Sequence, residues 1–176
     1  MPAPPRLFHV SEDAAIARFD PRPAPSPDAG VAGDAVWAIA ESHLPNYLLP
    51  RDCPRICFRP GPGTTHSDRQ TFLIGARRVV AIEASWLDRV RDCALAVYEM
   101  PPETFEEALP EAGYWISREA VAPMAMRRID DVLAALTETQ TEVRLLRDFW
   151  RLRDAVVASS LQFSIIRTRN AQPRGV

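Results

Sequence analysis

The sequence predicts an α+β protein, and three observations lead to this class. The chain has 176 residues, of which 47% are hydrophobic and 25% charged, as in an ordinary globular protein. Short apolar segments typical of strands mix with short helical segments, without the regular strand–helix–strand repeat of a doubly wound fold. One longer periodic segment near the end predicts a helix that covers the core. At this length we expect a single domain, residues 1–176.

The first third of the chain is expected to hold two short strands and a proline-rich connection. Residues 1–5 are expected to be a frayed terminus, followed by a strand at 6–10. Residues 20–34 form a predicted loop, because four of the 17 prolines fall there and restrict the backbone. The second strand is expected at 35–39, and a short helix at 41–49.

The same mixture continues through the rest of the chain. Further strands are expected at 56–58, 77–83, 94–100, 113–117 and 142–146, with an edge segment near 121–127. Short helices are expected at 84–91 and 130–136, with one helical turn at 103–108. Residues 60–70, which are rich in glycine and proline, are predicted to be a loop.

The strongest periodic pattern lies at 148–168. Its apolar residues recur at spacings of mostly three to five: Leu152, Val156, Val157, Leu161, Ile165 and Ile166. This spacing predicts a long amphipathic helix whose apolar face packs on the core of the domain.

Charge excludes several classes of function. The chain has 21 basic and 23 acidic residues, a net charge of −2, which argues against a general nucleic-acid coat. Every basic side chain is an arginine, so a Schiff-base lysine and a phosphate-loop lysine are both excluded. The charge is uneven, because residues 127–176 hold nine arginines against six acidic residues.

Cysteine and histidine usage predicts no metal site and no disulfide framework. The three cysteines are an odd number without a secretory signal, which favours reduced thiols. The three histidines show no zinc-ligand spacing. No run of eighteen apolar residues occurs, so we expect no membrane partner, and a cytoplasmic location is the default expectation. The cysteines are Cys53, Cys57 and Cys93, and the histidines are His9, His43 and His66.

The segment RLFHVSE places a histidine and a serine two residues apart on a predicted strand. Side chains two apart share a face, so His9 and Ser11 point the same way. Phe8 and Val10 point the other way, and we expect them to face the core. Two interpretations stay open: a polar pair that binds a ligand hydroxyl, or a histidine that faces solvent on an edge strand.

Two aromatic and two arginine residues follow within VWAIAESHLPNYLLPRDCPR, namely Trp37, Tyr47, Arg51 and Arg55. Aromatic rings stack on flat rings, and guanidinium groups bind phosphates through two hydrogen bonds, so the group suits a nucleotide-like ligand. The alternative is that Trp37 belongs to the core and that the arginines are solvated or paired with Asp52.

Three glutamates, Glu83, Glu99 and Glu119, lie near predicted strand ends, where a carboxylate can act as a general base. The sequence pairs none of them with a partner, so a structural role is the alternative for each.

Several segments together resemble a known family: RLFHVSEDAAIARFDPRP, VWAIAESHLPNYLLPRDCPR, VVAIEASWLDRV, VYEMPPE, YWISREAVAP, RRIDDVLAAL and LRDAVVASSLQFSIIRTRN. Over nearly the whole chain they resemble an uncharacterised bacterial family, a domain of unknown function, which implies no activity. More distantly, the first half resembles the ADP-ribosyltransferase fold. That resemblance implies a split antiparallel sheet with short flanking helices. His9 and Ser11 match its opening strand, and Tyr47 matches the aromatic residue that packs on nicotinamide.

The resemblance departs from the family pattern at the late strand GYWIS. Tyr114 stands about where the catalytic glutamate is expected, with Glu111 and Glu119 nearby. The chain is also similar to the branch related to RNA 2′-phosphotransferase, which uses a histidine and several arginines. The residues that this second resemblance implies are Arg6, His9, Arg22, Arg51 and Arg55.

The resemblance implies a protein that binds NAD as a substrate and transfers ADP-ribose to an acceptor. The acceptor (protein, nucleic acid or small molecule) and the oligomeric state are left open. The implied catalytic residues are His9, Tyr47 and Glu119. The implied binding residues are His9, Ser11, Arg22, Trp37, Tyr47, Arg51 and Arg55. The alternative is a non-catalytic module of the same fold that binds a ligand or a partner. For the enzyme, we expect His9, Tyr47 and Arg51 to face one cleft.

Overall fold

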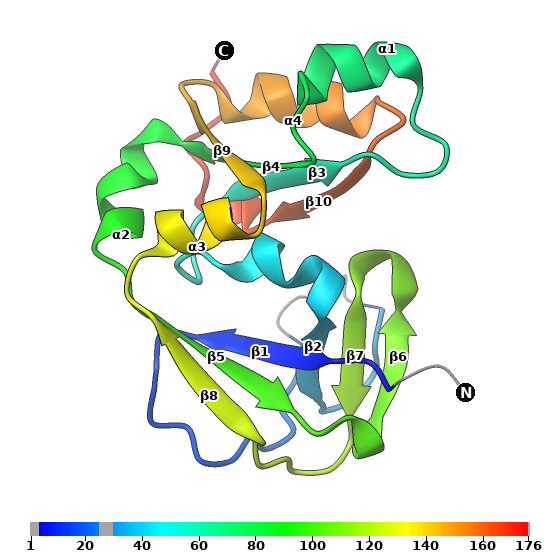
Figure 1. The fold of residues 1–176 in the computed structure, drawn as a ribbon, viewed down its shortest axis with the longest axis vertical. Helices are drawn as coiled ribbons and strands as arrows, with labels where there is room; N and C mark the ends of the chain where they lie inside the picture. Colours follow the sequence, from blue (N-terminus) through cyan, green and yellow to red (C-terminus); the bar gives the residue numbers. More distant parts are fainter. Residues whose placement is uncertain (1–3, 25–29, 176) are drawn as a thin grey trace. The chain divides into compact units, whose positions relative to one another are not determined.

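The computed structural model describes residues 4–24 and 30–175, and it confirms an α+β protein with two sheets (Figure 1). Contacts between Cα atoms divide the chain into two compact units. The first unit comprises Met1–Tyr47 and Ala94–Ile129, and the second comprises Leu48–Cys93 and Asp130–Val176. The chain therefore passes from one unit to the other three times. In the described part of the chain, no helix combines the length and the apolar character needed to cross a membrane.

The first unit is built on a six-stranded sheet in which every neighbouring pair is antiparallel, in the order β6-β7-β2-β1-β5-β8. A 3₁₀ helix, Glu41–Tyr47, follows β2 directly. The strands are β1 (Leu7–Ser11), β2 (Val36–Ala40), β5 (Leu95–Met100), β6 (Phe105–Leu109), β7 (Tyr114–Ser117) and β8 (Ala125–Ile129).

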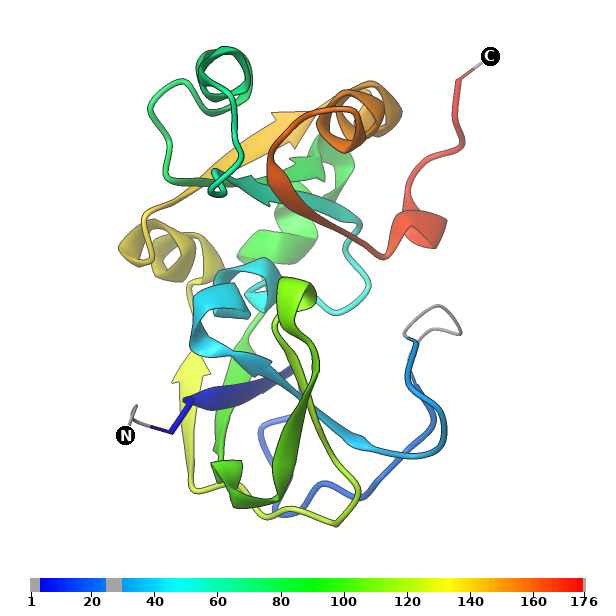
Figure 2. The ribbon, with the colours of Figure 1, turned by 90° about the vertical axis from the view of Figure 1, so that its right-hand side faces the viewer.

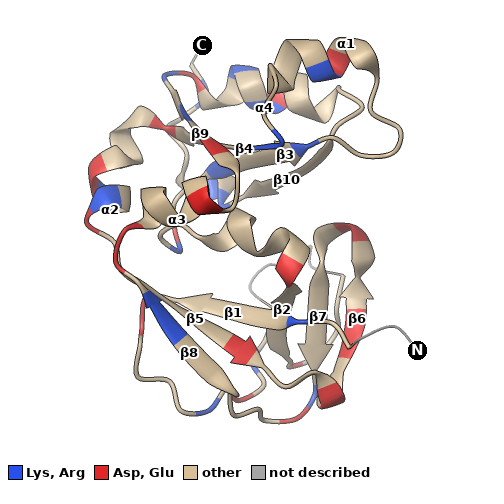
Figure 3. Ribbon diagram, in the orientation of Figure 1, with Lys and Arg blue, Asp and Glu red and all other residues tan. Residues whose placement is uncertain are grey.

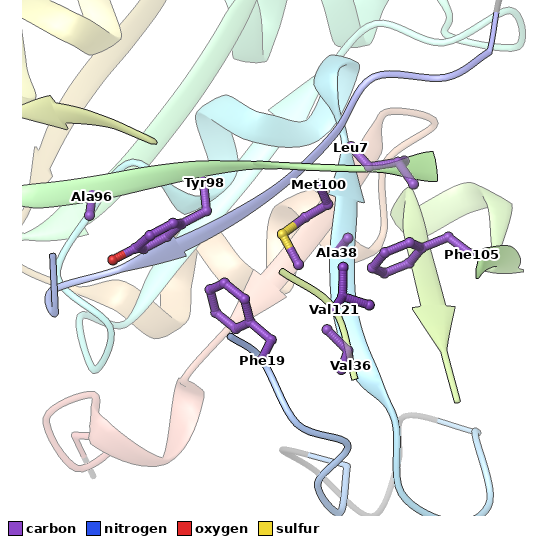
Figure 4. Close-up of a cluster of buried hydrophobic side chains, with 9 residues drawn as sticks. All are labelled: Leu7, Phe19, Val36, Ala38, Ala96, Tyr98, Met100, Phe105 and Val121. Atoms are coloured by element: carbon purple, nitrogen blue, oxygen red, sulfur yellow. The ribbon is translucent and has the colours of Figure 1, made fainter. Parts of the chain in front are cut away.

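The core of the first unit lies on one face of this sheet. Tyr98 and Met100 of β5 point toward Phe19, which the segment after β1 brings over the sheet (Figure 4). A backbone bridge between Phe19 and Val121 closes this layer, with both N–H···O distances at 2.8 Å. Alternate residues of each strand therefore build the cluster, as the two-residue period of a strand requires.

The second unit is built on a mixed four-stranded sheet in the order β10-β3-β4-β9, in which β4 and β9 are parallel. Alternate residues of β3 and β4, among them Ile56, Phe58 and Val79, pack on Phe149 and Val156 to form its core. The strands are β3 (Arg55–Arg59), β4 (Arg78–Glu83), β9 (Thr141–Leu146) and β10 (Gln162–Ile166). The helices are α1 (His66–Asp68), α2 (Leu87–Arg91), α3 (Val132–Glu138) and α4 (Phe149–Val157).

The long helix expected at 148–168 is wrong in its second half. Helix α4 ends at Val157, and Gln162–Ile166 forms β10, which pairs with β3. Ser159 donates a hydrogen bond of 2.6 Å from Oγ to the Val156 carbonyl, and the Ser160 N–H donates one of 2.7 Å to Asp68 Oδ2. These bonds take the place of the next helical turn, and the FSII segment that follows is rich in residues that favour strands.

Other departures are local. The loop expected at 60–70 ends early, because Thr65 caps a helix at His66 and accepts a 3.2 Å hydrogen bond from the Asp68 N–H. A π-helical turn, Arg69–Leu73, continues from there. The helical turn expected at 103–108 is confirmed only at its start, where Pro102–Thr104 forms a 3₁₀ turn, and the chain then forms β6. The expected edge segment lies at β8, slightly later than predicted.

Parts of two predicted loops lie outside the described residues. Residues 1–3 of the expected frayed terminus are among them, and residues 4–6 precede β1 without regular structure. Residues 25–29 of the expected 20–34 loop are also outside. Elsewhere in that loop, Arg22 forms a backbone bridge with Ala35.

Candidate functional site

His9 is held firmly on β1 of the first unit. Its Nδ1 lies 2.8 Å from the Trp37 carbonyl oxygen, and its ring centroid lies 4.6 Å from that of Phe19. A carbonyl oxygen only accepts, so Nδ1 donates this hydrogen bond. Ser11 Oγ accepts a 3.1 Å hydrogen bond from the Asp13 N–H. Both predicted side chains are thus fixed at the end of one strand.

The faces of β1 differ from the expectation. Leu7 belongs to the core cluster, and the alternation of the strand puts His9 and Ser11 on that same face. Phe8 is also buried, so both faces of the strand are covered. His9 is therefore neither a solvent-facing side chain nor opposite the core; it lies half-buried at the margin of the core, against Phe19.

Trp37, Tyr47 and Tyr114 form an aromatic group in the first unit. Tyr114 lies between the other two, with ring centroids 5.6 Å from Trp37 and 6.2 Å from Tyr47, both edge to face. Tyr47, at the end of the 3₁₀ helix, donates a hydrogen bond from its hydroxyl to the Tyr114 hydroxyl. The tyrosine that stands where the family glutamate is expected is thus a partner of the predicted stacking residue.

The sheet directs His9 and the aromatic group to opposite faces. Phe8 is the register partner of Ile39, and Ile39 is the partner of Tyr114, so these three side chains share one face. His9 lies on the other face, and it is linked to Trp37 through the Trp37 backbone carbonyl. A nucleotide bound on one face of this sheet would meet only one of the two groups.

The remaining predicted residues of the first unit are exposed. Arg22 exchanges two backbone hydrogen bonds with Ala35, at 3.1 and 2.9 Å. The Glu119 N–H donates to Ser117 Oγ at 3.2 Å, so the backbone of this loop is held while its carboxylate is exposed.

Arg6 and Glu99, two further residues with predicted roles, bind each other. Arg6 Nε donates to Glu99 Oε1 at 2.9 Å, and Arg6 also pairs with Glu41. The hydrogen bond from Arg6 lowers the pKa of Glu99 below its ordinary value. Glu99 is therefore held ionised as an ion-pair partner, which makes it a weak general base.

Arg51 and Arg55 belong to the second unit. Arg55 opens β3 and is only 3% exposed, and its Nη1 donates to the Pro50 and Cys53 carbonyls, at 3.0 Å each. These bonds fold the chain before β3 around the guanidinium, and Arg51 lies exposed in that turn. Ile166 of β10 is the register partner of Arg55.

Arg167 follows Ile166 and joins this turn. Its Nε donates to the Arg51 carbonyl at 3.1 Å and lies 4.0 Å from Asp52 Oδ1. Burial lowers the pKa of Arg167, and the positive charges of Arg169, Arg51 and Arg55 lower it further, against the opposing effect of Asp52. We call Arg51, Arg55, Arg167 and Arg169 the arginine cluster.

The arginine cluster lies in the basic unit of the molecule. The second unit holds fifteen of the arginines against eleven acidic residues, a formal charge of +4. The first unit holds six against twelve, a charge of −6, and acidic residues gather on β6 (Figure 3). Several guanidinium groups with one nearby carboxylate favour the binding of an anion.

Sequence reasoning found half of this cluster. The predicted helix at 148–168 places Arg167 at its tail and Arg169 just beyond it, so no sequence pattern connects either residue with Arg51. The available signal was the basic excess of residues 127–176, which indicates an anion-binding region without placing it.

Other reactive side chains of the second unit are buried. Burial raises the pKa of both Cys53 and Cys57 to about 12, and Cys93 is also buried and forms no disulfide with a described residue. Among residues 4–24 and 30–175, no three His, Cys, Asp or Glu side chains gather as a potential metal site. Glu83, at the end of β4, is 4% exposed and accepts a 2.9 Å hydrogen bond from the Gln172 N–H.

Comparison with known proteins identifies the family. No curated protein and no solved structure matches the chain. A family model described as "Family of unknown function (DUF6886)" matches residues 8–171, which include every residue discussed above except Arg6, Leu7 and Gln172. The chain therefore belongs to this family of unknown function, DUF6886.

Proposed function

We propose that the protein binds a nucleotide, with NAD as the ligand to test first, and that Arg51 of the arginine cluster binds its phosphates. The observation that carries this proposal is the grouping of Arg51 and Arg55 with two further arginines in a unit of charge +4. A guanidinium presents a planar fork of N–H donors that matches phosphate oxygens, and a local positive potential raises the concentration of anions at the site.

The first unit, considered by itself, carries a second set of side chains, which suit a base or a ribose. Tyr47 and Trp37 offer rings for stacking, and both are only partly buried. His9, whose Nδ1 donates to the Trp37 carbonyl, and Ser11 lie on the same face of β1, and both side chain types suit a ribose hydroxyl. Because the sheet sends these groups to opposite faces, we propose only one of them for direct ligand contact, and mutation decides which.

The finer proposal is transfer of ADP-ribose. In that reaction the bond between the ribose C1′ and the nicotinamide nitrogen breaks, and neutral nicotinamide leaves with the bonding electrons. The acceptor forms the new bond to C1′ and loses a proton. Positive charge develops on the ribose in between, and a carboxylate stabilises such a charge. The exposed Glu119 of the first unit is the carboxylate that the resemblance implies for this role.

A non-catalytic binding module is the second candidate, and one observation favours it. Tyr114 stands where the family pattern has a glutamate, and its hydroxyl accepts the hydrogen bond from Tyr47. A module of this kind would bind the nucleotide without releasing nicotinamide.

Calorimetric titration with NAD, ADP-ribose and ATP tests the proposal. We expect micromolar to millimolar binding to the wild type, weakened about tenfold or more in Arg51→Gln. Arg151→Gln is the matched control, because Arg151 is an exposed arginine of α4 in the same unit. Absence of heat with all three ligands at millimolar concentration would refute nucleotide binding. Nicotinamide release measured on the same samples separates the enzyme from the module.

A further inference from the structure

We propose that Arg167 and Arg169 bind the pyrophosphate group of the ligand, and that residues 167–174 form a fixed part of that binding site. This inference deepens the proposed function and rests on it for the nucleotide. Every residue proposed for the pyrophosphate site lies in the second unit.

The backbone of Arg167 has an unusual conformation. It adopts the left-handed region, with φ 57° and ψ 32°, immediately after β10. A residue with a Cβ pays roughly 1 kcal/mol for this conformation, and glycine is the usual choice. An arginine at such a position turns the chain sharply, and it brings its side chain back to the Arg51 carbonyl. Strained residues of this kind concentrate at functional sites.

The guanidinium groups of this segment have unused donors. In the described part of the chain, Arg167 uses only Nε, toward the Arg51 carbonyl, so its two terminal nitrogens make no hydrogen bond. Arg169 is exposed, and its side chain makes no hydrogen bond or ion pair with a described residue. The positive charge of Arg169 repels that of Arg167 and lowers the pKa of Arg167, with Asp52 as the nearby carboxylate. An anion with several oxygens would relieve that repulsion.

The rest of the segment, the red end of the ribbon in Figure 2, is anchored at several points. Asn170 Nδ2 donates to the Asp52 carbonyl at 2.7 Å, and the Gln172 N–H donates to buried Glu83. Further along, Arg174 Nη2 donates to both Asp154 oxygens at 2.9 Å, and its guanidinium lies 4.8 Å from the ring centroid of Trp150. These anchors hold the backbone of the segment in place before a ligand arrives, which reduces the entropy cost of binding.

Glu83 acts in this arrangement as a positioning residue. Its Oε1 holds the Gln172 backbone, and the Gln172 carbonyl accepts a 2.8 Å hydrogen bond from Trp150 Nε1. Glu83 therefore sets the path of the segment from the end of β4. This hydrogen bond explains why the buried end of β4 carries a carboxylate and not an apolar side chain.

The ligand class follows from the number and type of donors. Neighbouring guanidinium forks suit a pyrophosphate, whose two phosphates each present several oxygens, better than a single carboxylate. Inorganic pyrophosphate is therefore the probe of choice, because it carries this group without a base or a ribose.

Calorimetry on the full chain tests the inference. Relative to wild type, we expect Arg167→Gln and Arg169→Gln each to weaken pyrophosphate binding about tenfold or more, since each removes charge-assisted hydrogen bonds. Arg151→Gln removes the same charge from the same unit and should leave the affinity within about twofold. Arg167→Gly keeps the left-handed backbone, so it folds at least as well as Arg167→Gln and should lose the same binding.

A second pair of variants tests the role of Glu83. Glu83→Ala removes the acceptor for Gln172 and should weaken pyrophosphate binding, whereas Glu83→Gln keeps an acceptor oxygen and should restore most of it. If Glu83→Ala fails to fold, Trp150→Phe removes the other anchor of Gln172 and serves in its place. Equal affinity of the alanine and glutamine variants, both folded, would overturn the positioning role.

The outcomes separate this inference from the proposed function. Failure of wild-type protein to bind pyrophosphate, or unchanged affinity in Arg167→Gln and Arg169→Gln, would overturn the inference. NAD binding that persists in those variants and depends on Arg51 would leave the proposed function standing. Pyrophosphate binding that depends on Arg167, without binding of NAD, ADP-ribose or ATP, would support the inference and refute nucleotide binding.

Discussion

The two units of this chain divide its chemistry between them. The first unit is acidic, has a wholly antiparallel sheet, and carries His9 and the aromatic group of Trp37, Tyr47 and Tyr114. The second unit is basic, has a mixed sheet, and carries all three cysteines and the arginine cluster. Each has its own buried cluster of apolar side chains. The contrast teaches that anion binding is best sought in the second unit, whereas His9 and the aromatic group make the first unit a separate candidate for a base or a ribose.

The largest expected effect is a loss of stability in the first unit, caused by a substitution at Gly113. Gly113 has φ 68°, and a Cβ there would lie 2.2 Å from Nδ1 of buried His43. We expect Gly113→Ala to lower the free energy of unfolding by about 3–5 kcal/mol, from steric overlap and backbone strain together. Thermal or urea unfolding measures the loss. Gly63→Ala is the control, because a Cβ there meets nothing within 4 Å, and a comparable loss in Gly63→Ala would contradict this explanation.

A milder change in the first unit tests whether the units unfold separately. Tyr98 is 1% exposed, donates to the Asp13 carbonyl at 2.8 Å and accepts from the Ile16 N–H at 3.0 Å. Tyr98→Phe leaves both backbone groups without this partner, at a cost of about 2 kcal/mol. Hydrogen exchange should show lost protection in β1 and β5, with β3 and β4 unchanged. Equal loss in all four strands would mean that the units unfold as one.

The cysteines give a matching test in the second unit. Because burial raises the pKa of Cys53 and Cys57 to about 12, both stay protonated in the folded state while the unfolded state ionises above about pH 9. Unfolding is therefore favoured as pH rises through that range, by about 1 kcal/mol per thiol at pH 10. Iodoacetamide at pH 8 should label neither thiol in folded protein and both in urea. Rapid labelling of the folded protein would contradict their burial.

The smallest expected effect is a gain. Ile74 ends the π-helical turn of the second unit with φ 50°, and it is 76% exposed, so it combines backbone strain with little packing. Ile74→Gly should raise the free energy of unfolding by up to about 1 kcal/mol, the strain relieved minus the entropy of glycine. Thermal unfolding checks the sign, and a lower midpoint than wild type would show that Ile74 makes packing contacts that outweigh its strain.

Most strands could be predicted because their apolar residues follow one another without a helical period. The strands expected at 6–10, 35–39, 77–83 and 142–146 match β1, β2, β4 and β9 closely. β10 could not be predicted, because the spacing of its isoleucines also fits a helix. Its pairing with β3, which is distant in the sequence, makes this segment a strand. β6 is likewise formed by pairing with β7, although its exposed glutamates have low strand propensity.

The candidate site was predictable only in its residue types. Arg51 and Arg55 were expected to act with Tyr47, a few residues away in the chain, yet Tyr47 ends a segment of the first unit and Arg51 lies in the second. Proximity in sequence carries no information about the boundary between units when a chain passes between them repeatedly. Arg167, more than a hundred residues away, meets Arg51 because β10 pairs with β3.

The most direct test of the central claim is a crystal structure of the protein grown with NAD. The account predicts that the pyrophosphate lies within hydrogen-bond distance of the Arg51 and Arg167 guanidinium groups in the second unit. A structure in which the pyrophosphate contacts only residues of the first unit, or in which NAD binds elsewhere and leaves the arginine cluster without a phosphate, would contradict it.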